Sequence, residues 1–227
     1  CVTARHQILV EVDDFFMARY PVTCGEYLSF LRDLARQDPE GAAARAPRVR
    51  NDGGQLWAPD ASGTYQLPQV DGQGLRWDPH WPVMGISFDD AMVYCSWYGV
   101  RTGQKVRLAT EYEWEKAGRS GDGRLYPWGD YFEPTYCKMA LSREGQPSPE
   151  KVGQFGADCS PYGIYDLAGL VSEYCDSDYS AAKHQKVARG GNYQTTGGVQ
   201  CRLTQRHPVQ RDEPSLLHGF RLVRDPS

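Results

Sequence analysis

The residue types that could do chemistry are thinly spread in this sequence. Its seven cysteines include no Cys-x-x-Cys pair of the kind that binds zinc or cycles as a dithiol. They stand at Cys1, Cys24, Cys95, Cys137, Cys159, Cys175 and Cys201. An odd and dispersed set fits buried, reduced thiols better than a disulfide framework, so we expect a cytoplasmic protein.

The C-terminal region offers the other reactive groups. His207 and His218 could approach each other, and two imidazoles with a carboxylate would make a metal site. No helical or turn spacing enforces that approach, so we expect two solvent-facing or singly hydrogen-bonded histidines and no metal. Cys201 could serve as a nucleophile beside His207, but a buried structural thiol in a strand over residues 201–206 is the preferred interpretation.

Three acidic side chains, Glu111, Glu113 and Glu115, stand at alternate positions. They lie at the expected start of a helix, where carboxylates are favoured by the positive end of the helix dipole. We therefore predict that they stabilise the helix and take no part in acid–base catalysis.

Composition limits the possible partners. The 227 residues carry a net charge of −4, and 40% of them are apolar. This balance gives no basic footprint for nucleic acid or an anionic membrane, and no apolar stretch approaches the roughly 18 residues of a membrane span. The length fits one domain over residues 1–227, and the start at Cys1 without methionine suggests the C-terminal part of a longer protein.

Local patterns predict the elements that must position these groups. The β-branched and aromatic runs at residues 7–12 and 15–19 predict strands. Three cap residues, each with a carboxylate three positions on and apolar residues at helical spacing, predict three helices. These pairs are Thr23 with Glu26, Ser87 with Asp90, and Thr110 with Glu113.

The remaining stretches predict irregular backbone. Residues 36–80 hold isolated aromatic residues among glycines and prolines, so we expect long loops with short strands and little helix. From residue 126 onward turn residues recur, and we expect buried aromatic residues such as Trp128, Tyr162 and Tyr165 to hold the loops. Three helices on a loop-rich chain indicate an α+β domain.

Six motifs then stand in a recognisable order. They cover residues 20–23, 82–87, 107–115, 126–129 and 162–169, and a final frame from Arg189-Gly190-Gly191 to Gly219-Phe220-Arg221. On these motifs the sequence resembles the formylglycine-generating enzyme (sulfatase-modifying factor) family over nearly its whole length. The resemblance implies a C-type-lectin-like α+β fold whose C-terminal segment lines the binding face. Within the family the chain looks most like copies fused behind bacterial serine/threonine kinase domains, which implies an upstream domain.

The resemblance also implies what chemistry to test for. Active members use two cysteines between the Arg-Gly-Gly and Gly-Phe-Arg motifs to bind copper and oxidise a substrate cysteine. This chain has Thr195 and the Gly198-Val199 region there, and such side chains cannot hold Cu(I). We therefore expect neither copper nor oxidase activity.

The family's calcium sites are degraded in the same way. Its usual Gly-Asn-Val is Gly-Leu-Val over residues 169–171, and Glu173 alone remains of that site. The asparagine of a second calcium site would fall near Tyr136 or Cys137. Because Ca²⁺ needs several oxygen ligands, we expect no bound cofactor.

Two functions of different classes follow. The first is a non-catalytic module that recognises a protein or a small polar ligand through a surface at about residues 192–217, a segment that retroelement variable proteins of this fold diversify. The second is a divergent copper-dependent formylglycine-generating oxidase or a related thiol oxidase. We favour the first, although an ordinary solvated loop would have the same polar composition. The predicted contact residues are Tyr193, Gln194, Thr195, Thr196, Gln200, Gln205, His207, Gln210 and Arg211.

Overall fold

The computed structural model describes residues 9–50, 53–71 and 74–226. It combines helices with several short sheets and long irregular segments, which confirms the predicted α+β class. None of the helices in these ranges is long and apolar enough to cross a membrane.

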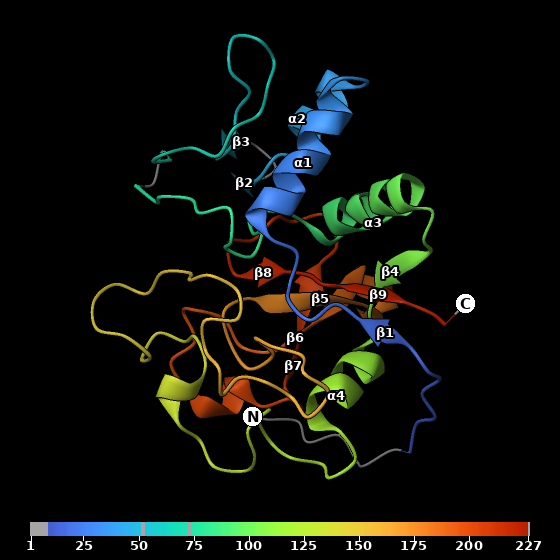
Figure 1. Ribbon diagram of the computed structural model, residues 1–227, viewed down its shortest axis with the longest axis vertical. Helices are drawn as coiled ribbons and strands as arrows, with labels where there is room; N and C mark the ends of the chain where they lie inside the picture. Colours follow the sequence, from blue (N-terminus) through green and yellow to red (C-terminus); the bar gives the residue numbers. More distant parts are fainter. Residues whose placement is uncertain (1–8, 51–52, 72–73, 227) are drawn as a thin grey trace.

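A four-stranded sheet crosses the centre of the molecule (Figure 1). Its longest strand, β5 (Ser172–Ser180), pairs antiparallel with β6 (Gln185–Arg189) and parallel with β8 (His218–Gly219). β7 (Arg206–Gln210) adds to the far edge of β6, giving the order β7-β6-β5-β8. The C-terminal third of the sequence therefore supplies the whole sheet.

All three predicted helix starts are confirmed. In each, the cap side chain accepts a hydrogen bond from the backbone N–H three residues on, and the carboxylate there accepts one from the cap backbone, which completes a capping box. The helices are α1 (Cys24–Ala35), α3 (Phe88–Thr102) and α4 (Glu111–Arg119), capped by Thr23, Ser87 and Thr110.

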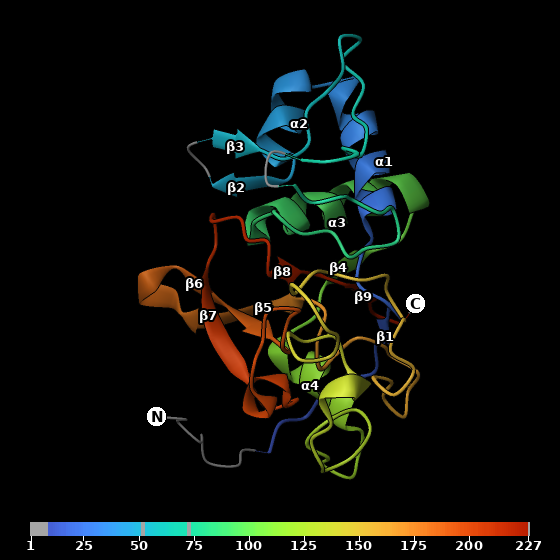
Figure 2. The same ribbon diagram turned by 90° about the vertical axis from the view of Figure 1, so that its left-hand side faces the viewer.

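The two faces of the central sheet pack against different helices. On one face, Tyr174 and Ala188 lie in a core cluster with residues of α1 and α3. On the other face, Cys175 and Val187 lie in a cluster with Trp114 of α4. Consecutive residues of β5 and of β6 lie in different clusters because successive side chains of a strand point to opposite faces. Figures 1 and 2 show α3 and α4 on opposite sides of the sheet.

A second sheet joins the two ends of the described chain. β9 (Leu222–Arg224) lies between β1 (Phe16–Met17) and β4 (Val106–Leu108) and is antiparallel to both. The strand predicted over residues 7–12 is wrong for residues 9–12, which form none, and residues 7 and 8 lie outside the described residues. Residues 9–11 are exposed and 12 is half-buried, and none of these four residues pairs with a described strand.

Residues 36–80 hold one helix that the sequence prediction missed. α2 (Pro39–Arg45) begins where the Asp38 side chain accepts a hydrogen bond from the Gly41 backbone N–H, with Pro39 in the first helical position. Both are recognised helix-start signals. The short hairpin of β2 (Arg48–Arg50) and β3 (Gly53–Gln55) and long loops make up the rest, as expected.

Residues 126–171 are irregular, as predicted, apart from the 3-10 turn η1 (Pro134–Tyr136). The same prediction is wrong beyond residue 171, where β5 to β9 form, because each of these strands pairs with a partner distant in the sequence and local periodicity does not show that pairing. The prediction that buried aromatic residues hold these loops is only partly correct. Tyr162 is 55% exposed and Trp128 and Tyr165 are half-buried, whereas Tyr126 is 2% exposed. Tyr126 packs with Cys137, Met139, Ala168 and Cys201, so small and sulfur-containing side chains fill this part of the core. The two other 3-10 turns are η2 (Ala181–Lys183) and η3 (Gly198–Cys201).

Candidate functional site

Arg189 fixes the start of the C-terminal segment. Its buried guanidinium donates to Glu115 Oε2 over 2.6 Å and to the Glu111 backbone carbonyl over 3.1 Å. The Glu111 carboxylate accepts from Arg206 Nη2 over 2.9 Å. These acidic residues therefore tie α4 to β6 and β7, in addition to the helix stabilisation that the sequence predicts.

Two glycines then bring the chain against the loop that precedes β5. Gly190 has a φ of +77°, and a Cβ on it would lie 2.6 Å from the Leu167 carbonyl oxygen. A Cβ on Gly191 would lie 2.7 Å from the carbonyl oxygen of Ala168, to which the Gly191 N–H donates over 3.2 Å. Only glycine fits this close approach, so the entry to the segment is rigidly placed.

Two of the predicted contact residues lie inside the protein. Tyr193 is 4% exposed and belongs to the core cluster of α1 and α3. Thr195 is 8% exposed, and its hydroxyl accepts from the Asn192 N–H over 3.0 Å. The Thr195 carbonyl accepts from the Ala140 N–H over 2.9 Å. Both side chains are used to fold the segment, which corrects their assignment as ligand contacts.

The other predicted contact residues are spread from the surroundings of η3 to beyond the far end of β7. Gln194, Thr196 and Gln200 are exposed around η3. Arg211, past the opposite end of β7, donates to Asp89 of α3 over 2.5 Å. Figure 2 shows β7 running from η3 toward α3. A single surface over residues 192–217 is therefore reduced to a smaller one around η3. Gln205, His207 and Gln210, the predicted contact residues between η3 and Arg211, are half-buried.

The two histidines meet on one face of the central sheet. Their Nε2 atoms are 3.0 Å apart, and His207 stands opposite the small side chain of Ala188 on β6. Burial lowers the pKa of both imidazoles, and the pKa of His218 falls to about 3 because His207 adds to the effect of burial. Both histidines are half-buried, and each makes one side-chain hydrogen bond, which was one of the two expected alternatives. That hydrogen bond joins the two histidines to each other.

No third metal ligand joins this pair in the part of the chain that the structure describes. Within the described ranges, no group of three or more histidine, cysteine, aspartate or glutamate side chains is arranged to hold an ion. Two neutral imidazoles can share one proton between their Nε2 atoms, whereas the buried Nδ1 of His218 has no hydrogen-bond partner among the described residues. The geometry supports a structural hydrogen bond across the sheet.

Cys201 lies in η3 and not in a strand. The Arg202 carbonyl accepts from the Gln205 N–H over 2.9 Å, so a turn separates η3 from β7 and the predicted strand over residues 201–206 is wrong. Cys201 and Cys137 are both 0% exposed. A hydrogen bond to the Cys201 thiol, followed by burial, raises the pKa of Cys137 well above its usual value. A thiol with a raised pKa, as in Cys137, is a poor nucleophile and a poor metal ligand.

The copper positions of the resembled family carry no suitable donor in this chain. The Thr195 hydroxyl is buried and already hydrogen-bonded, and Gly198 and Val199 offer no donor side chain. The next residue, Gln200, is an exposed neutral amide. Because Cu(I) selects soft thiolates, the residues present do not fit it.

The calcium positions fail the same test. Both carboxylate oxygens of Glu173 accept hydrogen bonds from Arg221, and one also accepts from Trp114 Nε1 over 2.9 Å. Beside Tyr136 and Cys137, the buried ammonium of Lys138 lies 2.9 Å from Glu150 Oε1. Protein cations thus hold both carboxylates, and these sites do not fit Ca²⁺.

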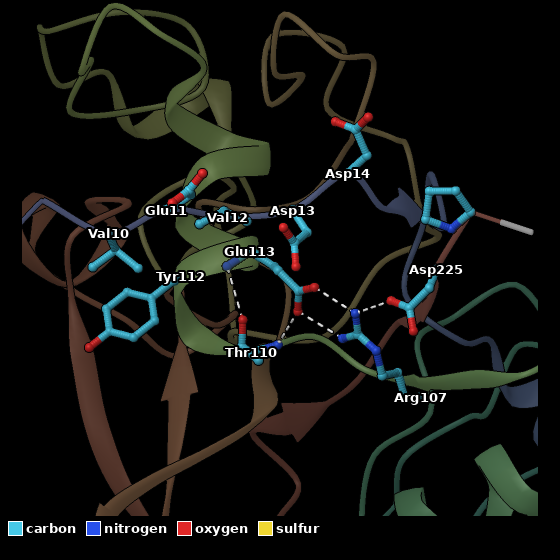
Figure 3. Close-up of a pocket in the computed structure, with 11 residues that line it drawn as sticks. Val10, Glu11, Val12, Asp13, Asp14, Arg107, Thr110, Tyr112, Glu113 and Asp225 are labelled. Carbon is cyan, nitrogen blue, oxygen red and sulfur yellow. Dashed lines mark hydrogen bonds and ion pairs between the residues drawn. The ribbon is translucent and has the colours of Figure 1, made fainter.

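A pocket of about 680 Å³ lies away from this segment (Figure 3). Residues 10–14, the start of α4 and Asp225 line it, and none of the predicted contact residues does. Arg107 donates to Glu113 Oε1 over 2.6 Å and to Asp225 Oδ1 over 2.5 Å. The sequence interpretation missed this pocket because it placed residues 10–12 in a strand.

Aromatic residues form an exposed ledge beside η3. The rings of Tyr126 and Trp128 stack with centroids 5.1 Å apart, and Tyr136 packs on Trp128 at 5.7 Å. Tyr131, at 5.9 Å from Tyr136, is 58% exposed, and Phe132, at 5.9 Å from Tyr126, is 38% exposed. We call these five residues the aromatic ledge. The sequence interpretation treated this region as core, although five aromatic residues within positions 126–136 were the available signal.

Comparison with known proteins places these features in a family. The model of the sulfatase-modifying factor enzyme 1-like domain matches residues 3–226. The inactive C-alpha-formylglycine-generating enzyme 2 of Bos taurus is 34% identical over 73% of this chain, and that of Mus musculus is 30% identical over 93% of it. The chain spans 57% of the length of the bovine protein and 75% of the mouse protein.

Solved structures share the fold. The structure of PvdO from Pseudomonas aeruginosa superposes with a TM-score of 0.71 at 19% identity, covering 93% of this chain and 80% of that one. Treponema denticola variable protein 1 gives a TM-score of 0.62 at 16% identity, covering 93% of this chain and 84% of that one. The chain therefore belongs to the family of the sulfatase-modifying factor enzyme 1-like domain.

Proposed function

We propose that this domain is a non-catalytic recognition module on a formylglycine-generating-enzyme-like scaffold. One observation carries the proposal. The segment between Arg189 and Gly219 contains a single thiol, Cys201, which is fully buried against Cys137. Oxidation of a substrate cysteine at copper needs a pair of accessible thiolates, and this chain does not supply them there.

The relatives include inactive proteins as well as enzymes. The inactive C-alpha-formylglycine-generating enzyme 2 matches at 34% identity in Bos taurus and 30% in Mus musculus. A formylglycine-generating enzyme of Thermomonospora curvata and a hercynine oxygenase of Mycolicibacterium thermoresistibile each match at 31%. The formylglycine-generating enzyme of Bos taurus matches at 26% identity over 95% of this chain. The scaffold therefore occurs both in proteins named as inactive and in named enzymes, so a non-catalytic role is compatible with the relatives.

The surface around η3 supports recognition of a protein or a small polar ligand. Gln194, Thr196 and Gln200 are exposed there and offer amide and hydroxyl groups. The backbone that carries them is fixed by Gly190, Gly191 and the buried Thr195, so the surface is ordered before binding. Order of this kind lowers the entropy cost of association.

Two measurements on the purified chain test the proposal. Competition with a chromogenic chelator measures Cu(I) binding, and mass spectrometry follows conversion of a cysteine-containing sulfatase peptide, with the bovine formylglycine-generating enzyme as positive control. We expect neither binding above background nor conversion. Tight one-to-one copper binding that is lost in Cys201→Ser, together with peptide conversion, would instead make the protein a divergent oxidase.

A further inference from the structure

The aromatic ledge and η3 form one continuous surface, although they are more than 60 residues apart in the sequence. Tyr126 Oη donates to the Gly198 carbonyl over 3.1 Å. The ring of Phe132 lies so close to Gly198 that a Cβ there would be 2.6 Å from it. Figures 1 and 2 both show η1 and η3 near each other at the same end of the molecule.

The exposed part of this surface has an apolar centre and a polar border. Tyr131, Phe132 and Val199 are 58%, 38% and 41% exposed. Thr196 and Gln200 of the same segment are exposed beside them. Adjacent exposed apolar groups with a polar rim are typical of an interaction surface.

The rings of the aromatic ledge are held in place before any ligand arrives. Trp128 Nε1 donates to the Tyr131 carbonyl over 2.9 Å, and the Tyr131 and Tyr136 hydroxyls are 3.0 Å apart. Rigid tyrosine and tryptophan rings provide contact area at little cost in conformational entropy. The arrangement is therefore ready for stacking contacts.

The charge of this surface indicates the chemistry of its partner. Residues 126–136 include Asp130 and Glu133 and no lysine or arginine, and residues 192–201 include none either. Arg124 donates to the Pro127 carbonyl over 2.8 Å and is paired with Asp122, so Glu133 is the carboxylate beside the aromatic ledge that faces no such cation among the described residues. Hydrogen bonds from the Thr135 N–H and hydroxyl hold the pKa of Glu133 below its usual range, so this carboxylate is charged at neutral pH. Aromatic faces beside a carboxylate attract cations, and arginine most of all, through cation–π and ionic contacts.

We propose that the aromatic ledge and η3 bind an arginine-containing segment of a partner polypeptide. Guanidinium groups stack on Tyr131 and Phe132 while Glu133 supplies the opposite charge, and Thr196 and Gln200 contact the peptide backbone. This inference rests on the proposed recognition function and names the class of ligand that serves it.

Fluorescence anisotropy with two labelled peptides tests this directly. The probe is a nine-residue peptide of alternating glycine and arginine, and its partner has glutamate in place of arginine. We expect the arginine peptide to bind at least tenfold more tightly than the glutamate peptide. Binding should weaken when salt is raised, because the carboxylate contact is exposed.

Variants distinguish binding at the aromatic ledge from nonspecific electrostatic attraction of the arginine peptide to an acidic protein. Tyr131→Ala with Phe132→Ala should weaken binding of the arginine peptide about tenfold, and Glu133→Gln should weaken it severalfold. Tyr162→Ala removes a ring that is 55% exposed elsewhere and should change nothing. Asp14→Asn, in the acidic pocket of Figure 3, removes the same charge as Glu133→Gln and should also change nothing.

Two results would overturn the inference: no binding of the arginine peptide, or equal binding by the ledge variants and the controls. Circular dichroism of each variant confirms that it is folded, as expected for exposed side chains. The copper and peptide-conversion measurements are independent of this one. A chain that binds neither copper nor the arginine peptide keeps its proposed recognition function and loses only this ligand class.

Discussion

Arg221 donates from Nε to Glu173 Oε2 over 2.6 Å, and its Nη2 donates to the other oxygen of the same carboxylate. Each side chain is 1% exposed. Nη2 of Arg221 also donates to the Tyr165 carbonyl over 2.8 Å, and Trp114 Nε1 donates to Glu173 Oε2. The Gly-Phe-Arg motif is thus joined to the central strand, to α4 and to the loop before β5.

Arg221→Ala should destabilise the fold by about 3–5 kcal/mol, because it leaves the Glu173 carboxylate buried without its counter-charge. Arg36→Ala is the control, since Arg36 pairs with Asp33 on the surface with a side chain that is 77% exposed. Loss of that pair should cost no more than about 1 kcal/mol. Urea unfolding followed by circular dichroism measures both, and equal costs would contradict the structural role of Arg221.

Trp114 and Trp128 should differ in their contribution to stability. Trp114 is 1% exposed and hydrogen-bonded to Glu173, so Trp114→Ala should cost about 3–5 kcal/mol. Trp128 is half-buried in the aromatic ledge, so Trp128→Ala should cost less, about 1–2 kcal/mol. Chemical denaturation of the two variants compares them. A larger loss from Trp128 would mean that the ledge belongs to the core.

The histidine pair should make the fold less stable in acid. Burial lowers the folded-state pKa of His207, and that of His218 lies at about 3, whereas both titrate near 6.5 when unfolded. Between these values the unfolded chain binds more protons, so stability falls as pH falls below about 6.5. The double variant His207→Gln, His218→Gln should show a flatter profile of urea midpoint between pH 4.5 and 7.5. An unchanged slope would contradict the neutral pair.

Asp166 should have the opposite effect. It is 2% exposed, and burial raises its pKa to about 6, above its unfolded value. Between about pH 4 and 6 the folded protein binds more protons, so this group destabilises the fold as pH rises through that range. Asp166→Asn removes the charge, keeps an acceptor for the Gly153 N–H and tolerates the φ of +62°.

Asp166→Asn should therefore raise stability at pH 7 by about 1–3 kcal/mol and leave it almost unchanged at pH 4. Thermal melts at both values measure this. Asp14→Asn, on the exposed N-terminal stretch, should change neither melting temperature. A melting temperature of Asp166→Asn that is lower at pH 7 would show that the carboxylate is needed in its charged form.

Local sequence signals predicted the helices well because each depends on neighbouring residues. The capping box at Thr110 and Glu113 needs only a four-residue pattern, and the structure has it. The cap at Asp38 was equally readable but was outweighed by the glycines and prolines around it. The family frame from Arg189 to Arg221 predicted the fold, since both arginines are buried and bind distant carboxylates.

The candidate site was less predictable because it depends on tertiary contacts. Tyr193 and Gln194 are adjacent and both carry a polar group, yet Tyr193 is buried and Gln194 is exposed. Only the approach of the loop before β5 decides between them. The meeting of His207 with His218 depends on a parallel pairing of β8 with β5 that no local spacing encodes.

The central position of β9 has a consequence for how the protein is made. β9 separates β1 from β4, and Phe220 and Arg221 just before it are 0% and 1% exposed. Among the described strands β9 is synthesised after all the others, and it closes the second sheet through contacts that are long-range and slow to form. The exposed side chains around η3 can change without loss of the fold only while the reading frame and the strand that follows are kept. A frameshift there would remove the closing strand as well as the surface, so variation in this segment is restricted to substitutions and in-frame changes.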